Sequence, residues 1–546
     1  MLTHARIPGA LAVAFTITGL VLALCGLPLV FLWAAALAAS ALLLSRWLSA
    51  GLTLAVTSIG FMTIEDLLLV TGSFGGPGIL ATQCIAWTAI GAGAGIASAV
   101  IPAPARSWTG ADRRLALAAG SGTIVVVLLT IVGTILPGAV HLAWAMNDDS
   151  VRDLFDARLI LASHGTGSTP GDPTPLPFGI TAANMLPGRG SMPPAGLLRF
   201  DVTRMAEVWI AVAAGTCLLL GAIVARGLRG VRASIAIPLT VIVSLAGLSW
   251  WVIGIQLADG YLNAGFAIIV LLAAWHAYLE SERRPLTGLI VLTAAAIVMV
   301  PTWSPMIICV GALAVLVLVR LVARLSQVLA VIVVVALAVL AIAAVFTVGL
   351  RSNDLSKDGG FPELSTPIVF AFVALIAIVL IVDALRMGLR HVASGTIALT
   401  AAGVVGMAYL LYQRRDSADL FGYYPEKFSW LMAVLLAVVC ITMISSLLVR
   451  RPVAGRAQRA VLASLVVVVI AVAVVAGWAT APERLSPVFG ILAGKVFDVG
   501  DTEADTVFRL VNEDRNPDLR HAAPDFRTEW IDYYVGEYAT HSAPSN

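Results

Sequence analysis

Apolar runs of about 17–25 residues recur along most of this 546-residue chain. Each run is long enough to cross a hydrocarbon core of roughly 30 Å as a helix. The chain is 59% hydrophobic and 12% charged, whereas a soluble domain typically carries about 25% charged residues. The apolar and polar residues do not alternate over segments of about ten residues, as they do in transmembrane β-barrels. We therefore expect an all-α polytopic membrane protein.

The apolar runs predict about fifteen transmembrane helices, separated by charged and turn-forming residues. The predicted spans are residues 9–27, 29–45, 52–72, 78–102, 115–136, 206–225, 233–253, 264–280, 286–301, 306–323, 327–348, 367–385, 395–412, 430–449 and 458–478. This number of spans predicts that the two ends of the chain lie on opposite sides of the membrane.

Arginines gather in every second connection between these spans. They are Arg46, Arg106, Arg113, Arg114, Arg226, Arg229, Arg232, Arg283, Arg284, Arg320, Arg324, Arg386, Arg390, Arg450, Arg451, Arg456 and Arg459. Cytoplasmic loops carry the excess of Lys and Arg, so we assign this side to the cytoplasm, with the N-terminus inside and the C-terminus outside. The cytoplasmic connections are short, and we expect the chemistry on the outer face of the plasma membrane.

The long polar segments fall on the predicted outer side. They divide the chain into N-terminal transmembrane helices (1–136), an extracytoplasmic acidic loop (137–205), C-terminal transmembrane helices (206–478) and a short extracytoplasmic tail (479–546). The three lysines of the chain, Lys357, Lys427 and Lys495, also lie on this side. They run against the positive-inside bias, so each needs a local explanation.

The acidic loop opens with the sequence "HLAWAMNDDSVRDLFDARLILASHG" (141–165). Its acidic and apolar residues predict an amphipathic helix from Asp149 to Ala162, with Asn147 or Asp148 as the N-cap. One interpretation of Asp148 and Asp149 is a capping pair with a solvated acidic face. The alternative is a general base at the membrane–water boundary, with one carboxylate activating a hydroxyl and the other tuning it or holding a cation.

A second unusual segment, "FGYYPEKFSW" (421–430), puts a lysine among aromatic residues at the start of an apolar run. Tyr423, Tyr424 and Trp430 are typical of an interfacial aromatic belt. Lys427 can extend its stem along apolar surface and place its ammonium at headgroup level. The two interpretations are a membrane anchor with a snorkelling lysine and a site for an anionic lipid headgroup.

Glu65 and Asp66 lie inside the predicted span 52–72. Carboxylates in an apolar helix are costly and mark a functional site by default. They can line a substrate cavity, bind a cation or relay protons. The structural alternative is an internal ion pair with an arginine of a neighbouring helix.

The two outer segments together resemble the GT-C superfamily of glycosyltransferases. The sequence "NDDSVRDLFDARLILASHG" is similar to the first loop of actinobacterial arabinosyl- and mannosyltransferases of that class, and "GYYPEKFSW" resembles a YY-x-x-K element in some of them. The resemblance implies a GT-C-like fold whose first extracytoplasmic loop is catalytic. It also implies inverting transfer of a sugar from a polyprenyl-phosphate donor to an envelope glycan or glycolipid hydroxyl, in cell wall biogenesis. The five spans predicted before the loop and the short tail depart from that family.

The resemblance also implies roles for particular residues. Asp149 or Asp148 would be the catalytic base, because the acceptor hydroxyl must lose a proton. Cations would receive the departing lipid phosphate. The candidates for that task are Lys427, Arg414, Arg415 and Arg158, and the candidates for the substrate cavity are Tyr423, Tyr424, Glu65, Asp66, His164 and Asp259.

Several alternatives stay open at this point. A transporter or flippase for a lipid-linked or small solute is the second hypothesis, supported by Glu65 and Asp66 in a span. No cofactor is certain, although Asp148 and Asp149 can hold a divalent cation through their oxygens. The net charge of +2 gives no indication of nucleic-acid binding. The sugar, the acceptor, the linkage and the oligomeric state are not specified by these patterns.

Overall fold

A computed structural model describes residues 2–72, 78–101, 110–136, 142–146, 149–166, 174–322, 366–450 and 507–508. Within these ranges the chain is helical and contains no strand. Ten helical stretches of the described residues are long and apolar enough to cross a membrane, or eleven if the bent pair Gly110–Ala119 and Ser121–Ile135 forms one span. The prediction of an all-α polytopic membrane protein is therefore confirmed for the described chain, whereas the count of fifteen and the N-in/C-out topology stay predictions.

The N-terminal helices form one bundle, in which α1 packs against both α2 and α4. Their bounds are α1 Leu2–Leu24, α2 Val30–Leu44, α3 Ala50–Gly72 and α4 Ile79–Val100. Gly91 and Gly95 of α4 face α1, and a Cβ at Gly95 would lie only 2.7 Å from Val13 Cγ2 and 3.0 Å from the Val13 backbone nitrogen. Small residues at this contact let the two helix backbones approach closely.

The predicted span 115–136 is two helices rather than one. α5 (Gly110–Ala119) and α6 (Ser121–Ile135) meet at an angle of 55°. The break falls at Gly120, in agreement with the tendency of glycine to interrupt helices.

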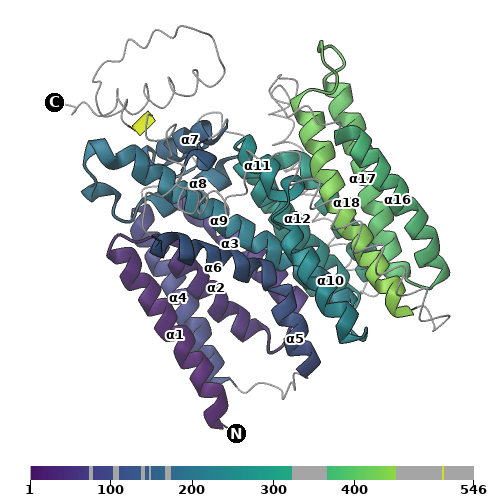
Figure 1. Ribbon diagram of the computed structural model, residues 1–546, viewed down its shortest axis with the longest axis horizontal. Helices are drawn as coiled ribbons and strands as arrows, with labels where there is room; N and C mark the ends of the chain where they lie inside the picture. Colours follow the sequence, from purple (N-terminus) through teal and green to yellow (C-terminus); the bar gives the residue numbers. More distant parts are fainter. Residues whose placement is uncertain are drawn as a thin grey trace.

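The acidic loop is largely helical. It contains η1 (Ala143–Ala145), α7 (Ser150–Ala162), α8 (Pro175–Met185) and η2 (Arg189–Ser191), and α9 (Pro194–Gly227) follows. The expected loop boundary at residue 205 therefore falls inside α9. In Figure 1, α7 and α8 lie at the end of the molecule away from the N-terminus.

The middle of the chain supplies the most enclosed helix. α10 (Ala233–Ala246), a π-helical turn η3 (Trp250–Gly254) and α11 (Ile255–Ala258) lead into α12 (Leu262–Ser281). α12 is 89% buried over its apolar window, more than any other described candidate span. α13 (Pro285–Trp303) packs on α12, and a short turn η4 (Ser304–Met306) connects it to α14 (Ile307–Val322), which packs against it.

Three long helices complete the described chain at the right of Figure 1: α16 (Thr366–Arg386), α17 (Arg390–Gln413) and α18 (Tyr423–Arg450). α18 also contacts α9 and α12. Of the tail only residues 507–508 are described, with Phe508 beneath the Arg199 guanidinium at 5.4 Å. The predicted spans 327–348 and 458–478 lie outside the described residues.

Candidate functional site

The Lys427 side chain is fully buried in the first turns of α18. Its ammonium donates hydrogen bonds to Asn263 Oδ1 at 2.9 Å and to Tyr423 Oη at 2.7 Å. Tyr423 and Lys427 lie four residues apart, so they share one face of the helix. The ammonium therefore does not snorkel to the surface, and that part of the prediction is wrong.

Aromatic rings enclose the same ammonium. Its nitrogen lies 3.9 Å from the ring centroid of Tyr261, 4.9 Å from that of Tyr423 and 5.8 Å from that of Trp303. Tyr423 packs edge-on against both Tyr261 and Tyr424. Ring faces attract a cation more strongly when water is excluded, so this cage offsets part of the cost of burying the charge.

Asp149 lies immediately before α7 and faces the same cluster. Its carboxylate accepts a hydrogen bond from the Tyr423 hydroxyl, and its backbone N–H donates to the Asp259 carbonyl oxygen at 3.2 Å. Burial raises the pKa of Asp149, and the positive charges of Lys427 and Arg152 and the Tyr423 hydrogen bond offset part of that rise. A carboxylate with a raised pKa is a stronger base when it is ionised.

The structure thus brings Asp149, Tyr423 and Lys427 together from segments far apart in the sequence. Asp153 and Asp259 also lie close enough to interact electrostatically with the Lys427 ammonium. Asp153 is buried one turn into α7, so this acidic face is not the solvated one that the capping interpretation expected.

The predicted helix 149–162 is confirmed to within one residue, but the prediction of its cap is wrong. Asp149 occupies the N-cap position, and its side chain makes no capping hydrogen bond. The Asp149 carboxylate accepts a hydrogen bond from the Tyr423 hydroxyl instead. Asn147 and Asp148 lie outside the described residues, so the choice between the two carboxylates as the base stays open.

Two of the arginines predicted to bind phosphate are used by the loop between α17 and α18. The Arg414 side chain is fully buried and donates to the Asp419 carbonyl oxygen through Nε at 3.2 Å and Nη2 at 2.8 Å. Arg415 is exposed, lies 3.5 Å from an Asp416 carboxylate oxygen and stacks over the Tyr412 ring. These contacts shape the loop, and neither guanidinium contacts Lys427 in the described interactions.

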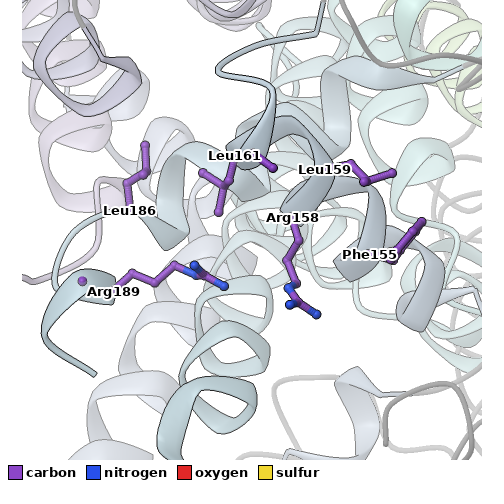
Figure 2. A pocket seen from close by; sticks show the side chains of 8 residues that line it. Phe155, Arg158, Leu159, Leu161, Leu186 and Arg189 are labelled. Carbon is purple, nitrogen blue, oxygen red and sulfur yellow. The ribbon is translucent and has the colours of Figure 1, made fainter. Parts of the chain in front are cut away.

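Arg158 lines a cavity of about 470 Å³ between α7 and η2. Figure 2 shows the side chains of Arg158 and Arg189 extending toward the same space. Sequence reasoning missed Arg189, whose Nε and Nη2 each lie 3.0 Å from a carboxylate oxygen of the buried Asp201. His164, at the end of α7, is exposed and has a positive φ of 60°.

Glu65 belongs to a separate network of α2, α3 and α4. Its carboxylate oxygens accept hydrogen bonds from Gln83 at 2.6 Å and from the Trp87 indole at 2.7 Å, and Gln83 in turn accepts one from Trp33 at 3.2 Å. These donors are neutral, so the alternative of an ion pair with an arginine is wrong for Glu65, whose partners are an amide and an indole. Asp66 is half-buried on the same helix.

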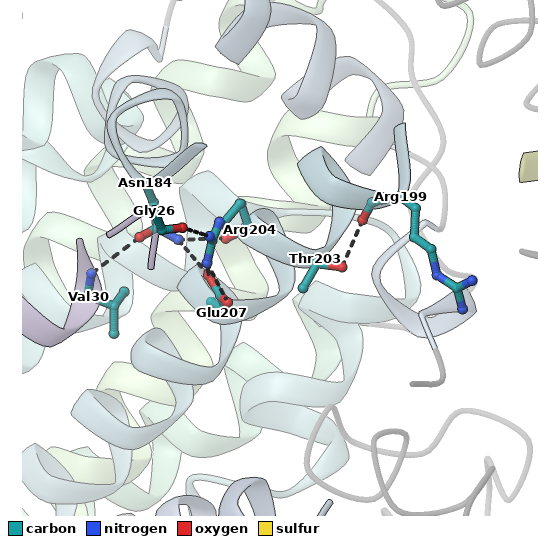
Figure 3. A network of polar contacts seen from close by, with 7 residues as sticks. All are labelled: Gly26, Val30, Asn184, Arg199, Thr203, Arg204 and Glu207. Atoms are coloured by element: carbon teal, nitrogen blue, oxygen red, sulfur yellow. Dashed lines mark hydrogen bonds and ion pairs between the residues drawn. The ribbon is translucent and has the colours of Figure 1, made fainter. Parts of the chain in front are cut away.

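A separate polar network joins α8 and α9 (Figure 3). The buried Asn184 donates to the Arg204 carbonyl oxygen at 2.9 Å and to Glu207 at 3.1 Å, and its Oδ1 accepts from the Val30 backbone at 3.2 Å. Arg204 donates to Glu207 and to the Gly26 carbonyl oxygen. The network ties both helices to the turn between α1 and α2.

No sequence pattern singles out Asn263 or Tyr261, which reach Lys427 through the turn after α11. Gly260 has φ +68° in that turn, a conformation that glycine adopts without strain. Among the described residues, no group of three or more His, Cys, Asp or Glu side chains is arranged to hold a metal ion. A role for a divalent cation stays a hypothesis.

Comparisons with protein-family models, with curated proteins and with solved structures find no match to this chain. The interpretation of the site therefore depends on its own geometry and on the resemblance of the two sequence segments.

Proposed function

We propose that the protein is an extracytoplasmic glycosyltransferase that moves a sugar from a polyprenyl-phosphate donor to a hydroxyl of an envelope glycan or glycolipid. The observation that carries this proposal is the contact of the Asp149 carboxylate with Tyr423, whose hydroxyl also accepts a hydrogen bond from Lys427. The raised pKa of Asp149 suits a general base. The resemblance of these two segments to GT-C enzymes supports the same assignment.

In the proposed reaction, Asp149 or its neighbour Asp148 removes the proton of the acceptor hydroxyl. The oxygen then forms a bond to the anomeric carbon as the bond from that carbon to the phosphate oxygen breaks. The lipid phosphate leaves with the electron pair, and the single displacement inverts the anomeric configuration. No external oxidant or reductant is required.

Lys427 is assigned a positioning role in this mechanism. Its ammonium is enclosed by Asn263 and the aromatic cage, which supports action through Tyr423 on the base rather than direct contact with the lipid phosphate. The burial of Arg414 and its bonds to Asp419 support a loop-ordering role for that arginine. Tyr424 and Asp259 border the same cluster, as proposed cavity residues.

The test is sugar transfer by the full-length protein in proteoliposomes. The liposomes would carry radiolabelled polyprenyl-phosphate pentoses or hexoses as donors and glycolipid acceptors. We expect D149N or D148N to abolish transfer while the protein stays folded and inserted. The matched control is D416N, the same change at a carboxylate that is 85% exposed, which should retain full activity.

Full activity of both single variants and of the double variant would remove the proposed base. Transfer that persists in K427M with an unchanged pH profile would remove the positioning role of Lys427. Loss of transfer in D416N as well would show that the assay responds to general damage, and the assignment of Asp149 would then fail.

A transporter or flippase is the second candidate, and one observation favours it. Glu65 is a fully buried carboxylate inside the span α3, held only by the neutral donors Gln83 and Trp87 in the described contacts. Buried carboxylates of this kind are typical of proton or ion pathways. Accumulation of a solute or translocation of a lipid-linked sugar in the same liposomes, with no glycosylated product, would favour this candidate over the transferase.

A further inference from the structure

α7 presents two different faces to its surroundings. Arg158 follows Asp149 by nine residues, and nine residues of α-helix complete about two and a half turns and rise about 13.5 Å. Asp149 and Asp153 therefore face the Lys427 cluster, while Arg158 lies on the opposite side of the helix. Arg158 therefore borders a surface separate from the one that Asp149 shares with Tyr423.

The cavity on this second face has the chemistry of an amphiphile site. Its lining combines Arg158 and Arg189 with apolar residues of α7 and with Leu186 and Gly190. Two of these residues are cationic, and the rest are apolar or glycine, with no acidic side chain in the described lining. Its volume of about 470 Å³ falls within the range typical of small-molecule sites.

The cavity is also open and held in shape. Leu159 is 40% exposed, and Ala162 and Gly190 at the rim are exposed. The bidentate contact with Asp201 fixes the Arg189 guanidinium, which lowers the entropy lost when a ligand binds there.

We propose that this cavity binds an anionic phospholipid, with the phosphate between Arg158 and Arg189 and an acyl chain against the leucines of α7 and Leu186. The Arg158 guanidinium matches phosphate oxygens in a bidentate geometry, and Arg189, whose Nε and Nη2 are paired with Asp201, offers its remaining N–H groups. The apolar lining adds contacts that an acyl chain makes and a free phosphate ion does not. The bilayer around the apolar helices supplies phospholipid beside the site. This site is distinct from the proposed transfer site and does not depend on it.

The test is lipid retention by the full-length protein, measured by native mass spectrometry. The protein is delipidated in a neutral detergent and then offered equimolar phosphatidylglycerol and phosphatidylcholine of the same chain length. We expect retention of phosphatidylglycerol over phosphatidylcholine by at least tenfold, since one charge-assisted contact of about 1.4 kcal/mol corresponds to that ratio. R158Q should remove the preference, and R158K should keep part of it.

Two further variants separate binding from folding. L159E places a negative charge at an exposed rim position and should also remove the preference, while the melting temperature stays within a few degrees of the parent protein. R415Q changes an exposed arginine that is not in the lining and should leave the preference unchanged. Equal retention of the two lipids by the parent protein, or an unchanged preference in R158Q and L159E, would overturn the proposal. Binding of glycerol phosphate or inorganic phosphate as tight as that of phosphatidylglycerol would overturn it too.

Discussion

The contact of Asp149 with Lys427 through Tyr423 predicts a measurable coupling energy between the two charges. Tyr423 Oη lies 2.7 Å from the ammonium nitrogen, and a hydrogen bond from a hydroxyl to a carboxylate spans about 2.7 Å. The charged groups are therefore separated by about 5.4 Å at most. At an effective dielectric constant of about 20, two unit charges at that separation attract by about 3 kcal/mol.

Partial exposure of Asp149 lowers this figure, because solvent screens the pair. We expect a coupling of about 1–3 kcal/mol in a double-mutant cycle of D149N and K427M. Asparagine keeps the oxygen that accepts the Tyr423 hydrogen bond, and methionine keeps most of the volume of the lysine stem. The cycle therefore isolates the charges from the packing.

The assay is the free energy of unfolding in mixed micelles, titrated with sodium dodecyl sulfate at several pH values. Burial raises the pKa of Asp149 in the folded protein, so the folded state binds its proton more tightly than the unfolded state does. Stability from this group is lost as pH rises from the unfolded pKa to the folded pKa. The Lys427 charge offsets part of the rise in the Asp149 pKa, so its removal enlarges that loss. K427M should therefore lower the free energy of unfolding more at high pH than at low pH. The coupling energy should fall to zero once Asp149 is protonated.

A matched cycle serves as the control. D149N combined with R415M removes an exposed cation that is paired with Asp416, and the two effects should be additive within about 0.5 kcal/mol. A coupling between Asp149 and Lys427 that is equally small, or that does not change with pH, would refute the electrostatic link.

Two further predictions concern stability away from this pair. E65A should lower the unfolding free energy by about 2–5 kcal/mol because it leaves the buried Gln83 and Trp87 donors unpaired. E65Q should lower it by less than half as much. Equal decreases in melting temperature for the two variants would contradict this. N184A should cost about 2–4 kcal/mol through its three lost hydrogen bonds, whereas T203A, which removes one exposed contact in Figure 3, should stay within about 0.5 kcal/mol.

The parts of the fold that follow from local pattern were predictable. Long apolar runs marked the helices, and the acidic and apolar periodicity of the loop marked α7 to within one residue. The start of α9 was not predictable in the same way. Its first turns carry polar residues such as Asp201 and Arg204, which are buried because Arg189, Glu207 and the Gly26 carbonyl oxygen pair with them. Such partners come from tertiary structure, and a hydropathy pattern treats these residues as loop.

The candidate site was predictable only in part, for the same physical reason. The rarity of lysine singled out Lys427, and the adjacent carboxylates singled out Asp149. Neither pattern indicates that Asn263 and Tyr261 close over the ammonium, because these residues reach it through a turn that depends on the packing of α12 against α18. The position of Arg158 in the acidic loop makes it a candidate, but helix periodicity puts it on the far side of α7 from Asp149.

Stability alone does not account for the buried charges around Lys427. Burying the Lys427 ammonium and the Asp153 carboxylate costs several kcal/mol per ion, and apolar replacement of such groups is often neutral or stabilising. The chain has only three lysines, and this one is fully enclosed with Asp149, Asp153 and Asp259 within electrostatic reach. A charge cluster of this kind is understandable if it keeps a base ionised and oriented beside a reacting hydroxyl. The K427M variant separates a role in stability from a role in the reaction. If it unfolds no more easily than the parent protein and yet transfers no sugar, Lys427 is needed for the reaction rather than for stability.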